Sequence, residues 1–157
     1  MFKVLKFGGS SLATAERIKN VADITRSVSA QGFPTVLVVS AIGGITDQLI
    51  DCAKTAEKNG AEAMAKLERI KQRHYDVYPR EMAERETESL ILAYFEELKD
   101  IFKAVSLIRV CSERAMDYLV SYGERLNASL MTRYLSNEGE QALYVDAREI
   151  IVTDKKH

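Results

Sequence analysis

The sequence is poor in the residues that most often build metal centres and nucleophilic active sites. It has two cysteines, two histidines, two prolines and no tryptophan among 157 residues. Cys52 and Cys111 fall in separate stretches of helical character, with neither a disulfide framework nor a metal-ligand spacing. We expect both to be small buried side chains in a reducing compartment. His74 lies in a charged helical stretch and is expected to be solvated, and His157 ends the chain.

An excess of charge and a long apolar run are also lacking. Twenty-two basic residues balance 23 acidic ones, so the net charge is −1 and no basic surface for nucleic acid is predicted. No apolar run reaches membrane-spanning length, and residues 1–9 (MFKVLKFGG) do not form a signal pattern. We therefore expect a cytoplasmic protein without a membrane or nucleic-acid partner. Neither GxxxxGK[ST] nor GxGxxG occurs, which excludes two common phosphate-binding motifs.

Two short apolar runs predict strands, and each runs into a turn of small residues. Residues 3–7 precede Gly-Gly-Ser-Ser, and the β-branched run 35–39 precedes Ser-Ala-Ile-Gly-Gly. A helix is predicted from Leu12 to about Ala30, with Ser10 or Ser11 as its N-cap, and another from near Thr46. This order indicates an α/β fold with a mainly parallel sheet.

The middle of the chain, about residues 47–110, shows only helical periodicity. Breaks near residues 58–60 and 78–79 predict three helices that form an insertion beside the sheet. After the insertion we expect a helix over 112–120, a break at 121–124, a second helix over 124–136 and a third strand at 141–145.

The two glycine turns are the main candidates for a ligand site, because ligands of open α/β sheets bind beyond the carboxyl ends of the strands. Glycine lets a backbone approach a ligand closely, and a following helix presents free amides to an anion. Lys6 precedes Gly8 and Gly9 by two residues. If its strand is buried on both faces, Lys6 needs an anionic partner. In an edge strand it would point into water, and the pattern favours neither interpretation.

The other candidate residues each have an ordinary structural explanation. Ser40 and Thr46 could bind a polar substrate, or they could end a strand and cap a helix. Glu124 could bind a cation, or it could be a surface carboxylate in the first turn of a helix. Asp146 and Arg148 follow the expected third strand, at the edge where ligands bind.

In this order, the motifs resemble those of the aspartate kinases. Lys6-Phe7-Gly8-Gly9-Ser10-Ser11 is similar to the KFGG[TS]S motif that opens these enzymes, with serine where threonine is commonest. Residues 38–46 (VVSAIGGIT) resemble V[VL]SAxxxxT, and residues 121–126 (SYGERL) resemble [SA]xGE[RK]. The segment after Asp146, with Thr153, and the long helical insertion also resemble the family.

The resemblance implies a fold, a reaction and roles for the motif residues. The fold would be the N-terminal part of an amino-acid-kinase-like three-layer α/β/α domain. The reaction would transfer the γ-phosphoryl group of ATP, with Mg²⁺, to the β-carboxylate of L-aspartate, giving aspartyl 4-phosphate for lysine, threonine and methionine synthesis. Lys6 would be catalytic and would bind ATP phosphates with Gly8, Gly9 and Ser10. Ser40, Thr46 and Glu124 would bind aspartate, and no metal-binding residue is assigned.

The resemblance covers residues 1–157 as the first part of a kinase domain, without its nucleotide-binding half and its regulatory ACT domains. We therefore expect the chain alone to be inactive, and the whole enzyme to be a homo-oligomer, with or without a fused homoserine dehydrogenase. Two alternatives remain: another amino-acid kinase, such as one acting on N-acetylglutamate, and a non-catalytic regulatory or structural module.

Overall fold

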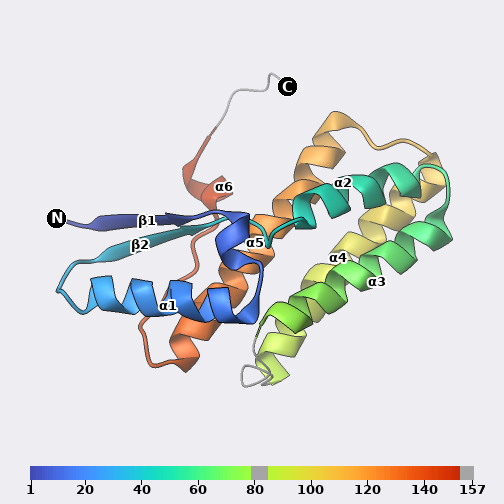
Figure 1. Ribbon diagram of the computed structural model, residues 1–157. Coiled ribbons are helices and arrows are strands. Elements are labelled where there is room, and N and C mark those ends of the chain that lie inside the picture. The colour runs from blue at the N-terminus through green and yellow to red at the C-terminus, as the bar shows by residue number, and fades with distance from the viewer. Residues whose placement is uncertain (79–84, 153–157) are drawn as a thin grey trace.

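The computed structural model describes residues 1–78 and 85–152, except for the side chains of residues 85 and 86. It is an α/β structure with a small parallel sheet and a large helical part (Figure 1). The elements, in order, are β1 Lys3–Phe7, the 3₁₀ turn η1 Gly9–Leu12, α1 Ala15–Ser29, β2 Thr35–Val39, α2 Ile45–Ala56, α3 Gly60–Val77, α4 Arg85–Ile108, α5 Glu113–Asn137 and α6 Ala147–Ile150.

The sheet places the ends of the two expected strands side by side. β1 and β2 pair in parallel, with Lys6 opposite Val38, and the amide of Ser40 continues the ladder by donating to the Phe7 carbonyl at 3.1 Å. Alternate residues of a strand point to opposite faces. One face packs Val39 into the core against α1 and α5, whereas Val38 on the other face is 42% exposed.

Helix α1 begins later than the sequence predicts. Its N-cap is Thr14, whose hydroxyl accepts from the amide of Arg17 at 3.3 Å. Ser10 and Ser11, the expected caps, lie instead in η1, which fills the space between β1 and α1. The prediction of the cap was wrong because a 3₁₀ turn uses those residues before the α-helix starts.

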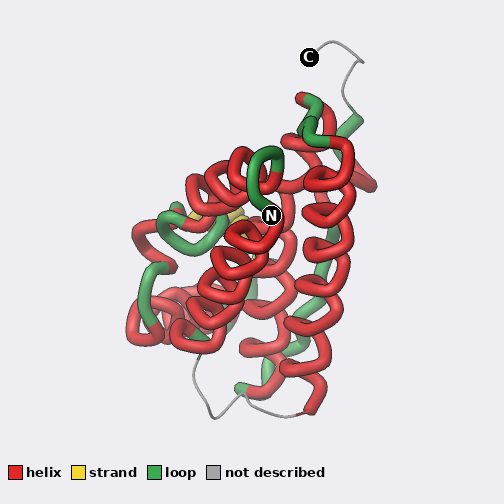
Figure 2. Tube along the Cα trace, turned by 90° about the vertical axis from the view of Figure 1, so that its right-hand side faces the viewer, coloured by secondary structure: helices red, strands yellow, loops and turns green. Residues whose placement is uncertain are grey.

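The helical insertion has the three expected helices, α2, α3 and α4, which run alongside one another with α5 (Figure 2). The break before α3 is confirmed: Asn59 is its N-cap and accepts from the amide of Glu62 at 3.2 Å. At the second break α3 ends at Val77 with Tyr78 as C-cap, while residues 79–84 lie outside the described residues. Cys52 is buried in α2 as expected, and burial raises the pKa of its thiol to about 11.

Two predicted features differ from the structure. The expected break at 121–124 does not exist, because α5 is one helix that passes through Gly123. A glycine inside a helix costs about 1 kcal/mol relative to alanine, which packing can offset. Residues 141–145 form no strand, because no neighbouring strand among the described residues pairs with them. Strand preference is expressed mainly through such pairing.

His74 is buried rather than solvated, which corrects the sequence-based expectation. Its side chain lies edge-on to Phe95, with ring centroids 5.5 Å apart, and the residue is 1% exposed. Nδ1 lies 2.8 Å from the Ile70 carbonyl, so Nδ1 carries the hydrogen and Nε2 is left without a partner among the described residues. Burial, with a smaller contribution from nearby Arg73, lowers the pKa of His74 to about 4.

We expect His74 to make the protein less stable in mild acid. The unfolded chain takes up a proton on this residue near pH 6.5 and the folded chain only near pH 4, so the free energy of unfolding falls as pH decreases between these values. The loss approaches roughly 3 kcal/mol at the acid end. Urea unfolding at pH 7 and pH 5 should show a smaller loss in His74→Gln than in the wild type. Equal losses would contradict this assignment.

Gly123 lets α5 approach the turn after β2, and we expect Gly123→Ala to destabilise the fold. A Cβ at this position would lie 2.7 Å from the Cβ of Ala41. Because alanine has no alternative side-chain rotamer, only a backbone movement could relieve this clash. Overpacking of this kind costs about 1–3 kcal/mol and outweighs the helix-propensity gain of about 1 kcal/mol. The measurement is the urea midpoint. Gly8→Ala is the control, because a Cβ there meets no atom within 4 Å. A Gly123→Ala protein as stable as the wild type would contradict the prediction.

Candidate functional site

The two glycine turns touch through their backbones at the carboxyl ends of the paired strands. A Cβ on Gly9 would lie 2.9 Å from the Ala41 carbonyl oxygen, and one on Gly43 would lie 3.0 Å from the Gly9 carbonyl oxygen. Such distances exclude any side chain at either position unless the backbone moves. The structure therefore brings together the first turn, with Gly8 and Gly9, and the second turn, with Ser40.

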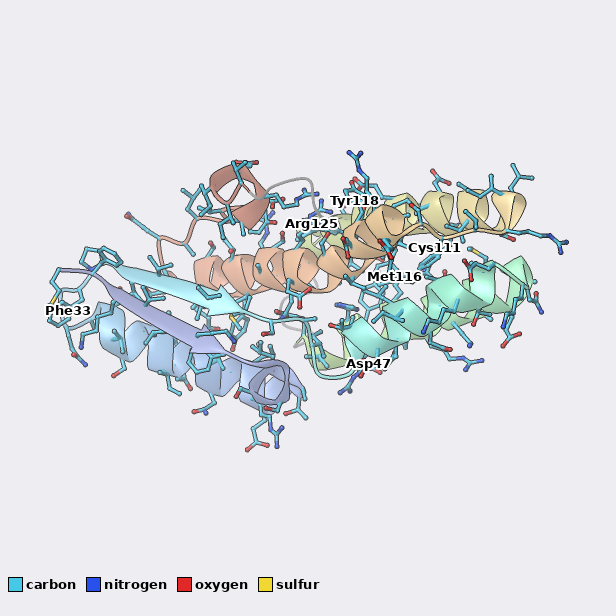
Figure 3. The ribbon with its side chains drawn as sticks, turned by 90° about the horizontal axis from the view of Figure 1, so that it is seen from above. Phe33, Asp47, Cys111, Met116, Tyr118 and Arg125 are labelled. Carbon is cyan, nitrogen blue, oxygen red and sulfur yellow. The ribbon has the colours of Figure 1, made fainter. Side chains whose placement is uncertain are left out.

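Helix α2 begins directly after the second turn. Its N-cap is Gly44, which has a left-handed φ of 84° and offers no side-chain cap. Thr46 is the second residue of the helix and half-buried, so the interpretation of Thr46 as the cap is wrong. The first amides of a helix have no acceptor within the helix and carry partial positive charge. An anionic group of a ligand would be stabilised here (Asp47 in Figure 3 marks the start of α2).

Helix α5 holds the second turn at a single peptide bond, the one between Ser40 and Ala41. The carboxylate of Glu124 accepts from the Ala41 amide at 3.3 Å. One helical turn later, the side-chain amide of Asn127 donates to the Ser40 carbonyl at 2.5 Å. Glu124 lies in the middle of α5, not in the first turn of a helix as the sequence suggested, so its position owes nothing to a helix terminus.

Lys6 lies on the exposed face of the sheet. It shares this face with Val4 of β1 and pairs with Val38 of β2, so the edge-strand alternative describes its exposure correctly. The Lys6 side chain has no ion-pair partner within the described part of the chain, and its ammonium is available to a ligand. Because Ser40 continues the β2 ladder by one residue, strand alternation places Ser40 on the same face as Val38 and Lys6.

The first turn is fixed by two arginines, neither of which the sequence analysis selected. Arg17 of α1 donates to the Ser10 carbonyl at 2.5 Å. Arg73 of α3 donates to the Ala13 carbonyl at 2.7 Å. Ser10 itself is exposed, so its hydroxyl is accessible from solvent. The helical insertion thus contacts the turn that follows β1, although the two are about sixty residues apart in sequence.

Asp146 and Arg148 belong to a structural cluster rather than to the glycine turns. Asp146 caps α6 and is bound by Arg148 at 2.7 Å and by Arg125 at 3.5 Å, and Arg148 keeps the pKa of the Asp146 carboxyl at about 2. Figure 3 shows Arg125 beside Tyr118, between α5 and the segment that leads to α6. The Arg125 guanidinium lies 4.6 Å from the ring centroid of Tyr122. This cluster fastens α6 to α5.

Sequence reasoning missed Asn127 and Tyr78, which are both buried beside the second turn. The Tyr78 hydroxyl lies 2.5 Å from Oδ1 of Asn127. A usable signal was present: Asn127 follows Glu124 by three residues and would share its face in a continuous helix. The expected helix over 124–136 contained both residues, but an asparagine three positions after Glu124 does not by itself indicate a contact with the distant Ser40 carbonyl.

Among the described residues, no three or more metal-ligating side chains lie close enough together to hold a metal ion. The helices in that part of the chain also include no candidate membrane span.

Comparisons with known proteins identify the family to which this arrangement of turns and helices belongs. A family model described as "Amino acid kinase family" matches residues 1–157. The chain is 37% identical to Aspartokinase 1, chloroplastic, of Arabidopsis thaliana over 96% of its own length and 26% of the relative's. Aspartokinase of Chlamydia pneumoniae is 30% identical over 98% of the chain and 32% of the relative.

Solved structures of aspartokinases resemble the chain as well. Escherichia coli aspartokinase III in complex with aspartate and ADP (R-state) superposes with a TM-score of 0.84 at 27% identity, covering 99% of this chain and 33% of that one. The same enzyme with lysine and aspartate (T-state) gives a TM-score of 0.68 over 89% of this chain and 30% of that one. The chain spans about a quarter to a third of the length of these relatives. With a match that runs through both glycine turns, the insertion and α5, the chain belongs to the amino acid kinase family.

Proposed function

We propose that this chain is the aspartate-binding and phosphate-facing part of an aspartate kinase, which transfers the γ-phosphoryl group of ATP to the β-carboxylate of L-aspartate. The proposal rests on one juxtaposition. The carboxylate of Glu124 lies against the second turn, and the second turn touches the first glycine turn, which follows Lys6. An ammonium-binding group and a phosphate-binding turn therefore share one edge of the sheet. The relatives named aspartokinases support the choice of substrate.

The chemistry of this reaction suits the residues that are present. The β-carboxylate of aspartate has a pKa of about 4 and is already ionised at neutral pH, so no general base is needed. The absence of a solvent-facing histidine among the described residues is therefore no obstacle, and buried His74 has no role in the reaction. The barrier arises because an anion must approach an anionic phosphate. Positioning and neutralisation of charge then supply the rate enhancement, as in phosphoryl transfer generally.

Lys6 and the first turn supply the positive side of the site. The exposed ammonium of Lys6 would contact phosphate oxygens of ATP and stabilise the charge that develops on them during transfer. Gly8 and Gly9 let the backbone amides of the turn approach the same oxygens, and the Ser10 hydroxyl lies within the same segment.

Ser40, Thr46 and Glu124 supply the aspartate side. Glu124 would bind the α-ammonium group of the substrate in a charge-assisted hydrogen bond. Ser40 follows the end of β2 and Thr46 lies at the start of α2, so their hydroxyls flank the second turn and would hydrogen-bond the substrate carboxylates. Since the Glu124 carboxylate already accepts from the Ala41 amide, its orientation is set before the substrate arrives.

Mg²⁺ would enter this site with ATP rather than on protein ligands of this chain. The described residues offer no acidic cluster to hold it, so the phosphate oxygens would be its main ligands. When bound, Mg²⁺ neutralises phosphate charge.

We also propose that catalysis needs the part of the kinase that the relatives possess beyond the matched third. The face of the sheet that carries Lys6 also has uncovered valines: Val4 is 57% exposed and Val36 is 48% exposed. Such a face normally packs against further structure. Kinase assays therefore require the complete kinase, meaning this chain followed by the remainder of an aspartokinase catalytic domain.

The direct test measures ADP formation by the complete kinase with aspartate or N-acetylglutamate as acceptor. Turnover with aspartate alone supports the proposal, and turnover with N-acetylglutamate alone would replace it with the second amino-acid kinase function. Turnover with neither would favour a non-catalytic module. The long helical insertion and the Gly123-Glu124 sequence favour aspartate.

Lys6→Ala should abolish turnover in the complete kinase without unfolding it. Loss of a group that stabilises transition-state charge typically costs about 2.7–4 kcal/mol, or roughly a hundredfold to a thousandfold in kcat. Because Lys6 makes no ion pair within the described residues, the substitution removes no stabilising contact among them, and the thermal midpoint should stay unchanged. Steady-state kinetics and thermal unfolding give the two readouts. Near-normal turnover would remove Lys6 from the mechanism.

Glu124→Gln should weaken the binding of aspartate much more than that of ATP. The glutamine oxygen can still accept from the Ala41 amide, so the second turn keeps its support while the negative charge is lost. A charge-assisted hydrogen bond contributes about 1.5–3 kcal/mol, which predicts a rise in the KM for aspartate of roughly ten- to a hundredfold. Equal increases for both substrates would show that Glu124 acts on the fold and not on the α-ammonium group.

A further inference from the structure

Helix α5 hydrogen-bonds both polar atoms of the peptide group between Ser40 and Ala41, through Glu124 and Asn127. A residue at the end of α3 in turn orients Asn127. Tyr78, the C-cap of α3, places its hydroxyl 2.5 Å from Oδ1 of Asn127 and 3.0 Å from the Asn127 main-chain carbonyl. Tyr78 is 4% exposed and Asn127 is fully buried, so bulk solvent does not reach these hydrogen bonds.

The hydrogen-bond directions in this network follow from the groups themselves. Both atoms that Tyr78 contacts on Asn127 are acceptors, so the hydroxyl must donate. Burial raises the pKa of Tyr78 well above its usual value, so the hydroxyl keeps its proton. With Oδ1 of Asn127 committed to Tyr78, Nδ2 must face the Ser40 carbonyl, to which it donates at 2.5 Å.

We propose that Tyr78 and Asn127 are positioning residues for the aspartate side of the site. They fix the plane of the Ser40–Ala41 peptide, and with it the Ser40 side chain and the amide that holds Glu124. The chain of contacts runs from α3 of the helical insertion through α5 to the end of β2. This role rests on the function proposed above. It also explains what the insertion contributes, since α3 then supports the turn that receives the amino-acid substrate.

The first turn has supports of its own outside this network. It is held by Arg17 of α1 and Arg73 of α3, which donate to the carbonyls of Ser10 and Ala13. Disturbing Tyr78 should therefore affect the second turn and leave the phosphate-facing turn in place. The two substrates would respond differently, and a general loss of packing would not produce that difference.

The chain offers a closely matched control in Tyr94. Its hydroxyl also reaches from the insertion to α5, where it pairs with Ser129 Oγ at 3.0 Å. Tyr78→Phe and Tyr94→Phe each remove one hydroxyl and keep the ring, but only the first should loosen the Ser40–Ala41 peptide. A second test variant is Asn127→Leu, which keeps the branching and the number of side-chain heavy atoms and removes the donor to the Ser40 carbonyl, while the Tyr78 hydroxyl retains the main-chain carbonyl of residue 127.

The first readout is amide hydrogen exchange at Ala41 in the complete kinase, which requires no assumption about the substrate. We expect exchange about tenfold faster in Tyr78→Phe and in Asn127→Leu, with Tyr94→Phe like the wild type. Unchanged exchange in both test variants, or an equal increase in Tyr94→Phe, would overturn the proposal. If Tyr78→Phe fails to fold, Asn127→Leu decides.

The second readout is kinetic. In Tyr78→Phe the KM for aspartate should rise about five- to tenfold while the KM for ATP changes less than about twofold. Parallel changes in both constants would overturn the positioning role even if aspartate phosphorylation itself is established. If the wild type does not phosphorylate aspartate, the proposed function fails, and the exchange experiment alone decides whether Tyr78 and Asn127 hold the peptide.

Discussion

Everything at the site depends on a close backbone contact between two turns. The parallel pairing of β1 and β2 ends both strands at the same edge, and the Ser40 amide extends that pairing by one residue. Gly9 and Gly43 then meet with no space for a side chain between them. This contact fixes where the first glycine turn lies relative to the second turn, which meets α5. Without it, Lys6 and Glu124 would be two unrelated charged groups on separate elements, and the site proposed above could not form.

Helices α3 and α5 hold the two turns of this contact in place through hydrogen bonds. Gly123 allows α5 to approach Ala41, and Glu124 and Asn127 then reach the two polar atoms of one peptide group. α3 contributes at both turns, through Arg73 at the first and Tyr78 at the second. A buried polar group is costly unless its hydrogen bonds are made, so each of these contacts specifies one arrangement of the elements as well as stabilising it. The insertion is therefore part of the site's framework.

Sequence patterns predicted the parts of this structure that depend on local rules. Short apolar runs followed by glycine turns indicated the two strands and their direction, and the break near residues 58–60 marked the start of α3. The failures came where tertiary contacts override local preference. Gly123 suggested a break, but packing against Ala41 keeps α5 continuous. Residues 141–145 have strand-like composition, and no strand among the described residues lies beside them. His74 sits among charged residues in sequence and against Phe95 in space.

The candidate residues of the site were found by motif, whereas Asn127 and Tyr78 depend on contacts between distant segments that no local pattern contains.

The uncovered valine face of the sheet has a consequence for how the 157-residue chain behaves in solution. Val4, Val36 and Val38 face water on a two-stranded sheet whose outer edges can pair with another chain. Exposed apolar side chains beside unpaired strand edges favour association between copies. Purified residues 1–157 would therefore self-associate as their concentration rises, and dilute solution would favour single copies.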